Sequence, residues 1–136
     1  MLKCLIVDDE VVCRKSIAQL LIPYGDCRIC SDGYQAIEAL SEAIDAGHPY
    51  DVVFLDIKMP GMDGHETLTA IREVEESRGI VGSDGVRVIM STSLADSKHC
   101  IQAFREGCEA YLVKPFGETQ LLEGLRQVGL EAAATE

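Results

Sequence analysis

The central apolar segment of the chain, residues 52–55, ends abruptly at a carboxylate. Its four apolar residues, two of them β-branched, are typical of a strand buried on both faces, as strands of a parallel sheet are. Asp56 follows directly, and Met59-Pro60-Gly61 then prevents the strand from continuing, because proline lacks a backbone donor. We therefore expect Asp56 at the carboxyl end of a central strand, the edge at which open α/β sheets bind ligands.

Three other apolar segments end in the same way. They are residues 3–7, followed by Asp8 and Asp9; residues 86–90, followed by Ser91 and Thr92; and residues 110–113, followed by Lys114. If all four strands are parallel, their carboxyl ends meet at one edge of the sheet. The sequence thus predicts that three carboxylates, a hydroxyl and an ammonium group gather there.

Amphipathic segments separate the strands and predict five helices. The apolar positions expected in the core are, helix by helix, Val12, Ile17, Leu20 and Leu21; Ala36, Ile37, Leu40 and Ile44; Leu68, Ile71 and Val74; Ile101, Ala103 and Phe104; and Leu121, Leu122, Leu125 and Val128. Asp63 with Glu66 predicts a capping pair at the start of the third helix, near Gly64. A thinner strand is expected over 26–30, and a flexible glycine-rich connection over 79–85.

This alternation of five strands and five helices predicts an α/β fold. Right-handed crossovers between parallel strands give a three-layer, doubly wound (βα)5 sandwich. At 136 residues the chain forms one domain, expected over residues 1–131, with 132–136 as a frayed tail.

Composition and charge narrow the possible functions. With 47% hydrophobic and 26% charged residues, the chain has the composition of a soluble globular protein. Its net charge of -11 repels phosphate backbones and anionic membranes, which argues against direct nucleic-acid binding and membrane insertion. The first apolar run is too short for a signal-peptide core or a membrane span, so a cytoplasmic location is expected.

The cysteines and histidines suggest no chemistry of their own. The six cysteines are expected to be reduced, and the C-x-x-C match of Cys27 and Cys30 lies in a strand-like run, where its thiols would point to opposite faces. His48, His65 and His99 show no triad or ligand pairing, which predicts surface histidines.

The predicted cluster of acids needs a counter-ion. Two carboxylates about 4 Å apart repel by roughly 1 kcal/mol in water and about 4 kcal/mol in a partly buried site. Asp8, Asp9 and Asp56 offer hard oxygen ligands that suit Mg2+, a cation that prefers one or two carboxylates together with phosphate oxygens. With Asp56 as nucleophile, Lys114 as a further positive charge and Thr92 as a hydrogen-bond donor, the set predicts phosphoryl transfer.

Four fragments of the chain, in order, resemble the receiver domains of two-component response regulators, the CheY-like superfamily. The fragments are Val7-Asp8-Asp9-Glu10, residues 55–64, Met90-Ser91-Thr92-Ser93 and residues 111–116. The resemblance spans nearly the whole chain and implies a flavodoxin-like fold with strand order 2-1-3-4-5. No DNA-binding module follows residue 131, so a stand-alone receiver with output by protein contact is expected.

The resemblance also implies a role for each acid. Asp56 would accept a phosphoryl group from a histidine kinase or a histidine phosphotransfer protein. Asp9, Asp56 and the backbone carbonyl of Lys58 would bind Mg2+ directly, and Asp8 would act mainly through water.

Further implied roles fall on the last two strands. Lys114 would pair with the phosphoryl group, and its peptide bond to Pro115 would be cis. Thr92 and Tyr111 would form a switch pair, in which the hydroxyl moves toward the phosphate and the ring turns inward. The surface formed by the last two helices and the last strand would bind a downstream protein.

Two features depart from the commonest receiver pattern. The connection over 78–85 is several residues longer than usual, and Lys58 and Ser93 lie where family side chains face the phosphoryl group, so the lifetime of the phosphorylated state stays open.

Three other functions fit the sequence less well than the receiver does. An aspartate-nucleophile phosphatase would need an acid two residues after the nucleophile, where the chain has Lys58. A flavin carrier would have its phosphate repelled by Asp8-Asp9-Glu10. A receiver that acts as a phosphorylation-independent scaffold is disfavoured by the intact set of acids, hydroxyl and lysine.

Overall fold

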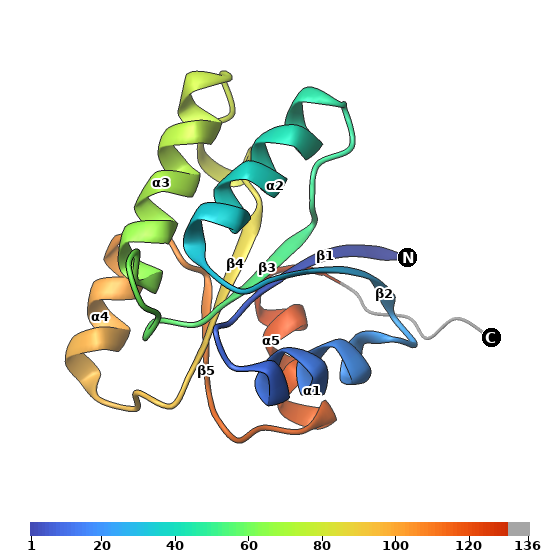
Figure 1. Cartoon of the computed structure of the whole chain (residues 1–136), viewed down its shortest axis with the longest axis vertical. Helices are drawn as coiled ribbons and strands as arrows, with labels where there is room; N and C mark the ends of the chain where they lie inside the picture. The colour runs from blue at the N-terminus through green and yellow to red at the C-terminus, as the bar shows by residue number, and fades with distance from the viewer. Residues whose placement is uncertain (131–136) are drawn as a thin grey trace.

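Five parallel strands form one sheet of order β2-β1-β3-β4-β5 in the computed structural model, which describes residues 1–130 (Figure 1). The strands are β1 (Leu2–Val7), β2 (Gly25–Cys30), β3 (Val52–Leu55), β4 (Arg87–Thr92) and β5 (Ala110–Val113). The helices are α1 (Val11–Leu21), α2 (Gly33–Asp45), α3 (Gly64–Ser77), α4 (Ser97–Arg105) and α5 (Glu118–Gln127). The predicted flavodoxin-like (βα)5 fold and its strand order are confirmed.

The helices cover both faces of the sheet. Figure 1 shows α2, α3 and α4 on one side and α1 and α5 on the other. Alternate residues of each central strand enter the two cores: Leu5 of β1 packs with the α2 and α3 side, whereas Ile6 packs with the α1 and α5 side. Burial on both faces explains why β3 is a continuous apolar run.

Several predicted core positions are wrong. Val12 is 79% exposed, because α1 buries Ile17 and Leu21, and a residue five positions before Ile17 lies on a different face of the helix. Ile101 and Phe104 of α4 are 52% and 46% exposed, since that helix turns the small Ala103 toward the sheet. Apolar spacing alone did not distinguish these exposed faces from buried ones.

One predicted surface histidine is also wrong. The side chain of His65, at the second position of α3, is buried and contacts Glu106 and His99. Both partners lie at α4, more than thirty residues away in sequence, so local spacing gave no sign of the contact.

Two segments are more regular than expected. The strand predicted over 86–90 runs over Arg87–Thr92, because Ser91 and Thr92 still pair with Leu112 and Val113 of β5. The 79–85 connection contains a short 3-10 helix over Gly82–Asp84. The tail predicted over 132–136 lies outside the described residues.

The start of α3 is anchored to the backbone that follows β3. The predicted capping pair is confirmed, since Asp63 accepts from the backbone of Glu66 at 2.8 Å and the Glu66 side chain accepts in return. The Gly64 N–H donates to the Ile57 carbonyl at 2.7 Å. A Cβ on Gly64 would lie 2.3 Å from the Asp56 carbonyl oxygen, so only glycine permits this approach.

None of the helices within residues 1–130 combines the length and the apolar character that a bilayer crossing requires.

The close approach at Gly64 generates a prediction about stability. Gly64→Ala is expected to destabilise the fold by about 3 kcal/mol, because the added methyl group overlaps two backbone atoms that have no room to move. Gly124→Ala in α5 is the matched control: its Cβ would meet Leu112 at ordinary contact distance, so a neutral or slightly stabilising effect is expected. Urea unfolding of both variants measures the difference, and equal stabilities would contradict the prediction.

Candidate functional site

Three charged side chains converge at the carboxyl edge of the sheet. The Lys114 ammonium group, from the end of β5, donates to Asp8 Oδ2 at 2.5 Å and lies 3.5 Å from Asp56 Oδ2. The lysine therefore reaches across β4 to carboxylates that follow β1 and β3, as the parallel strand ends predict. The predicted cis bond between Lys114 and Pro115 is present.

The ladder of the sheet continues into these residues and fixes their backbones. The Asp56 N–H donates to the Val7 carbonyl at 2.9 Å, and the Lys114 N–H donates to the Thr92 carbonyl at 2.8 Å. Asp56 and Lys114 thus each lie one residue beyond the end of a strand. Their side chains lie outside the apolar core, but their backbones still pair with the neighbouring strands.

Four carboxylates form a group that could hold a metal ion. One oxygen from each of Asp8, Asp9, Glu10 and Asp56 lies within 4.8 Å of the others. Asp8 and Asp56 are buried, whereas Asp9 and Glu10 are exposed, so the group opens to solvent on one side. Glu10 was not predicted as a site residue, although its position directly after Asp8 and Asp9 was the available signal.

The site holds more carboxylates than ammonium groups, and this excess of negative charge affects the pKa values of its residues. Burial raises the pKa of Asp56, the Lys114 ammonium group opposes that rise, and the neighbouring Asp8 carboxylate adds to it. Burial alone would lower the pKa of Lys114, but its hydrogen bond to Asp8 and the charge of Asp56 outweigh burial and raise it. One ammonium group thus faces two buried carboxylates, and the site favours a further cation.

The two predicted switch residues meet at a common neighbour, Leu94. The Thr92 hydroxyl accepts from the Leu94 N–H at 3.2 Å, and the Tyr111 hydroxyl donates to the Leu94 carbonyl at 2.5 Å. Thr92 is buried, Tyr111 is half-buried, and burial raises the pKa of Tyr111 to about 12. The β4–α4 loop is therefore tied to both side chains at one residue.

The remaining predicted positions lie at the rim. Lys58 follows Asp56 by two residues and its side chain is exposed, as is that of Ser93. Neither side chain covers the carboxylates, so the solvent-facing side of the site is bordered by the flexible Lys58 side chain and the small Ser93 side chain.

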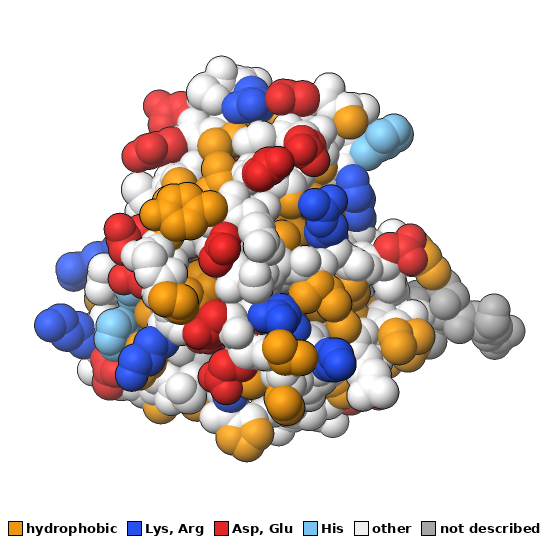
Figure 2. Space-filling model, in the orientation of Figure 1, with side chains coloured by type: hydrophobic (Ala, Val, Ile, Leu, Met, Phe, Trp, Pro, Cys, Tyr) orange, Lys and Arg blue, Asp and Glu red, His pale blue; other side chains and the backbone are white. Residues whose placement is uncertain are grey.

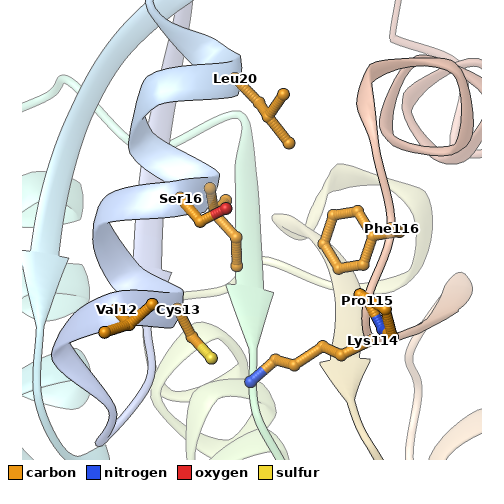
Figure 3. A pocket seen from close by; sticks show the side chains of 8 residues that line it. Val12, Cys13, Ser16, Leu20, Lys114, Pro115 and Phe116 are labelled. Carbon is orange, nitrogen blue, oxygen red and sulfur yellow. The ribbon is translucent and has the colours of Figure 1, made fainter.

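A mostly apolar groove of about 220 Å3 adjoins the Lys114 side chain. Figure 3 shows Val12, Cys13 and Leu20 of α1 on one wall and Pro115 and Phe116 of the β5–α5 loop on the other. Burial raises the pKa of the Cys13 thiol, although the nearby Lys114 opposes the rise. On the face shown in Figure 2, exposed hydrophobic side chains lie among basic and acidic ones.

Comparison with known proteins identifies the family. The sequence model of the response regulator receiver domain matches residues 4–126. The chain belongs to the response regulator receiver family. It is a phosphoacceptor receiver domain, and hence a signalling domain, and no finding favours the alternative functions considered above.

Sequence relatives of this receiver domain include free-standing proteins and parts of longer ones. It is 32% identical over 127 residues to the chemotaxis protein CheY of Listeria monocytogenes, covering 93% of this chain and 98% of that protein. It is also 36% identical over 147 residues to probable histidine kinase 5 of Oryza sativa, covering 97% of this chain but 12% of the kinase.

Solved structures agree on the fold. CheY in a complex with CheX, BeF3 and Mg2+ from Borrelia burgdorferi superposes with a TM-score of 0.80 at 26% identity, covering 96% of this chain and 90% of that one. The receiver domain of the histidine kinase CKI1 from Arabidopsis thaliana, complexed with Mg2+ and BeF3-, gives 0.79 at 27% identity, covering 93% and 89%.

The raised pKa of Asp56 generates a prediction for the metal-free receiver. Because its folded-state pKa lies above the unfolded value, ionised Asp56 destabilises the fold, and stability is lost as pH rises from about 4 through the raised folded-state pKa. Asp56→Asn is therefore expected to raise the free energy of unfolding at pH 7 by about 1 kcal/mol.

Asp8→Asn is the matched control, since it removes the negative charge paired with Lys114 and leaves one acceptor oxygen for the two donors that the carboxylate now binds, Lys114 Nζ and the Glu10 N–H. It is expected to lower stability by about 2 kcal/mol. Urea unfolding in the presence of a chelator compares the two variants. Destabilisation by Asp56→Asn would contradict the inference that the ionised Asp56 carboxylate destabilises the metal-free fold.

Proposed function

We propose that this receiver acts in the cytoplasm and that its phosphoacceptor is Asp56, which takes the phosphoryl group of a histidine kinase or a histidine phosphotransfer protein. An Asp56 carboxylate oxygen attacks phosphorus as the bond to the donor imidazole breaks, and the imidazole, which carries a proton on its other ring nitrogen, leaves as a neutral molecule. The observation that carries the proposal is the position of Lys114, whose ammonium group lies between the carboxylates of Asp8 and Asp56.

Mg2+ is the proposed cofactor, because the donor set fits it. The carboxylates of Asp9 and Asp56 and the backbone carbonyl of Lys58 would hold the ion, with Asp8 acting mainly through water. When bound, Mg2+ supplies positive charge to the phosphoryl oxygens. The four clustered carboxylates in a site with one ammonium group support this choice over a softer metal, which would prefer nitrogen or sulfur ligands.

The chain's own residues supply the rest of the chemistry. The Lys114 ammonium group neutralises charge on a phosphoryl oxygen once Asp56 is modified. The Thr92 hydroxyl, which now accepts from the Leu94 N–H, has a proton to donate to the same group. Asp56 is 4% exposed, and this burial limits the access of water to the acyl phosphate.

The groove between α1 and the β5–α5 loop is the proposed contact for the donor protein. It borders Lys114, and the exposed Val11 and Val12 at the start of α1 add apolar surface beside it. A donor histidine must approach Asp56 closely. An apolar surface beside the charged site binds the donor protein without forming hydrogen bonds or ion pairs to the phosphoryl group.

The proposed output surface is the α4-β5-α5 face. Ile101 and Phe104 of α4 and Val113 of β5 are large apolar side chains left exposed there. Movement of Thr92 toward the phosphoryl group would release the Leu94 N–H, and Tyr111, bonded to the carbonyl of the same residue, would respond. A downstream protein that binds this face would then distinguish the two states.

Phosphorylation is tested with a small phosphodonor. Incubation with acetyl phosphate and Mg2+ is expected to add one phosphoryl mass to the wild type and none to Asp56→Asn, as measured by intact-protein mass spectrometry. Asp45→Asn, which removes an exposed acid of α2, serves as control and is expected to behave like the wild type. An equal phosphoryl mass on Asp56→Asn would place the modification elsewhere and overturn the proposal.

Metal binding is tested through stability. Mg2+ at about one hundred times its dissociation constant is expected to raise the free energy of unfolding of the wild type by about 2.7 kcal/mol. Asp9→Asn should lose most of this gain because it removes a ligand, whereas Asp84→Asn, in the exposed 3-10 turn, should keep it. The same gain in all three proteins would exclude the proposed ligand set.

A further inference from the structure

A chain of three titratable side chains joins α3 to α4, apart from the phosphorylation site. His65 of α3, whose side chain is 7% exposed, lies between Glu106 and His99. Its Nδ1 lies 2.5 Å from Glu106 Oε1, and its Nε2 lies 3.0 Å from His99 Nδ1. The two rings have planes 18° apart and centroids 5.3 Å apart, as expected for imidazoles joined nitrogen to nitrogen.

The hydrogen bonds among Glu106, His65 and His99 limit how many protons these three side chains can hold. The Glu106 carboxylate accepts, so His65 Nδ1 carries a proton. The contact between His65 Nε2 and His99 Nδ1 needs one proton shared between two nitrogens. With both imidazoles fully protonated, two N–H groups would face each other at 3.0 Å and two positive charges would adjoin, so the contact must open.

The surroundings of the pair compensate one positive charge but not two. The carboxylates that face it are those of Glu106, at the C-terminal cap of α4, and Asp96, at the N-terminal cap. Asp96 already accepts from the His99 backbone N–H at 2.9 Å, and on the α3 side the neighbour is the neutral Thr69 hydroxyl, 3.4 Å from Glu106 Oε2. Within residues 1–130, a second proton thus meets no further anion in contact with the rings.

These three side chains also lie between the loop after Asp56 and the first turn of α4. His65 follows Gly64, whose N–H is bonded to the Ile57 carbonyl beside Asp56. On the other side, His99 lies in the first turn of α4, a helix with Ala103 as its buried residue. Little apolar burial holds α4, so a polar contact to α3 forms a large share of its attachment.

We propose that the Glu106–His65–His99 chain is a proton-sensitive latch that holds α4 against α3 with one shared proton and opens when both imidazoles are protonated. Acidity then acts on the same helix as the phosphoryl switch, through a different contact. The latch requires neither phosphorylation of Asp56 nor bound metal, so it can fail or hold independently of the proposed function.

Stability against pH tests the latch, and the third histidine supplies the control. A free histidine takes up its proton near pH 6.5, so at pH 5.5 both imidazoles of the unfolded chain carry a positive charge, whereas the latched contact admits only one. Between pH 7.5 and 5.5 the folding equilibrium constant of the wild type is therefore expected to fall about tenfold more than that of His99→Gln, measured by urea unfolding.

Two further variants complete the experiment. His65→Gln should lose the extra pH dependence as His99→Gln does, whereas His48→Gln, in the exposed loop after α2, should retain it in full. His99 is partly exposed, so His99→Gln is expected to fold even if the buried His65 does not tolerate replacement. Equal pH dependence in the wild type and His99→Gln, or its loss in His48→Gln, would overturn the latch.

Discussion

One contact governs the site: a single ammonium group, that of Lys114, held between two buried carboxylates. The pair with Asp8 is short and strong, while Asp56 keeps only the weaker, longer contact. Removing either carboxylate from water costs several kcal/mol unless positive charge compensates it. The fold thus preserves a deficit of positive charge at Asp56, and that deficit favours the binding of a further cation beside this carboxylate.

The sheet makes this arrangement possible because its ladder extends to the charged residues themselves. Backbone hydrogen bonds at Asp56 and Lys114 keep their side chains on one edge, although they are fifty-eight residues apart in sequence. The length of β4 also matters for Thr92. Because Thr92 is the last paired residue of that strand, the sheet holds its backbone, and its hydroxyl accepts from the Leu94 N–H just beyond the strand end.

Sequence reasoning predicted the sheet and the site for the same reason. In the sequence of a parallel sheet, the carboxyl end of each strand can be recognised as the point where an apolar run stops. Asp8, Asp56, Thr92 and Lys114 could therefore be placed at one edge of the sheet from the sequence alone. Helix faces were less predictable. The amphipathic period fixes which residues share a face but not how much of that face the sheet covers, and so Val12, Ile101 and Phe104 were misplaced.

Contacts between side chains on different helices could not be predicted at all. His65 is a polar residue in a first turn, and a solvated position is the ordinary expectation for it. Its burial depends on Glu106 and His99, seven residues apart and hence on one face of α4, which come opposite it only after α3 and α4 pack on the same side of the sheet. The roles of individual site residues also rest on chemistry rather than on position alone.

The two helices that the latch joins differ in how firmly they are held, and that difference decides which one can move. On α3, Leu68 and Ile71 are fully buried, Gly64 is locked to the loop after Asp56, and Arg72 binds the carbonyls of Val86 and Gly107. On α4 a single small residue is buried, and Gly107 beyond its end is fixed by Arg72. Because α4 buries one small residue and α3 buries several larger ones, displacing α4 exposes less apolar surface and requires less free energy than displacing α3.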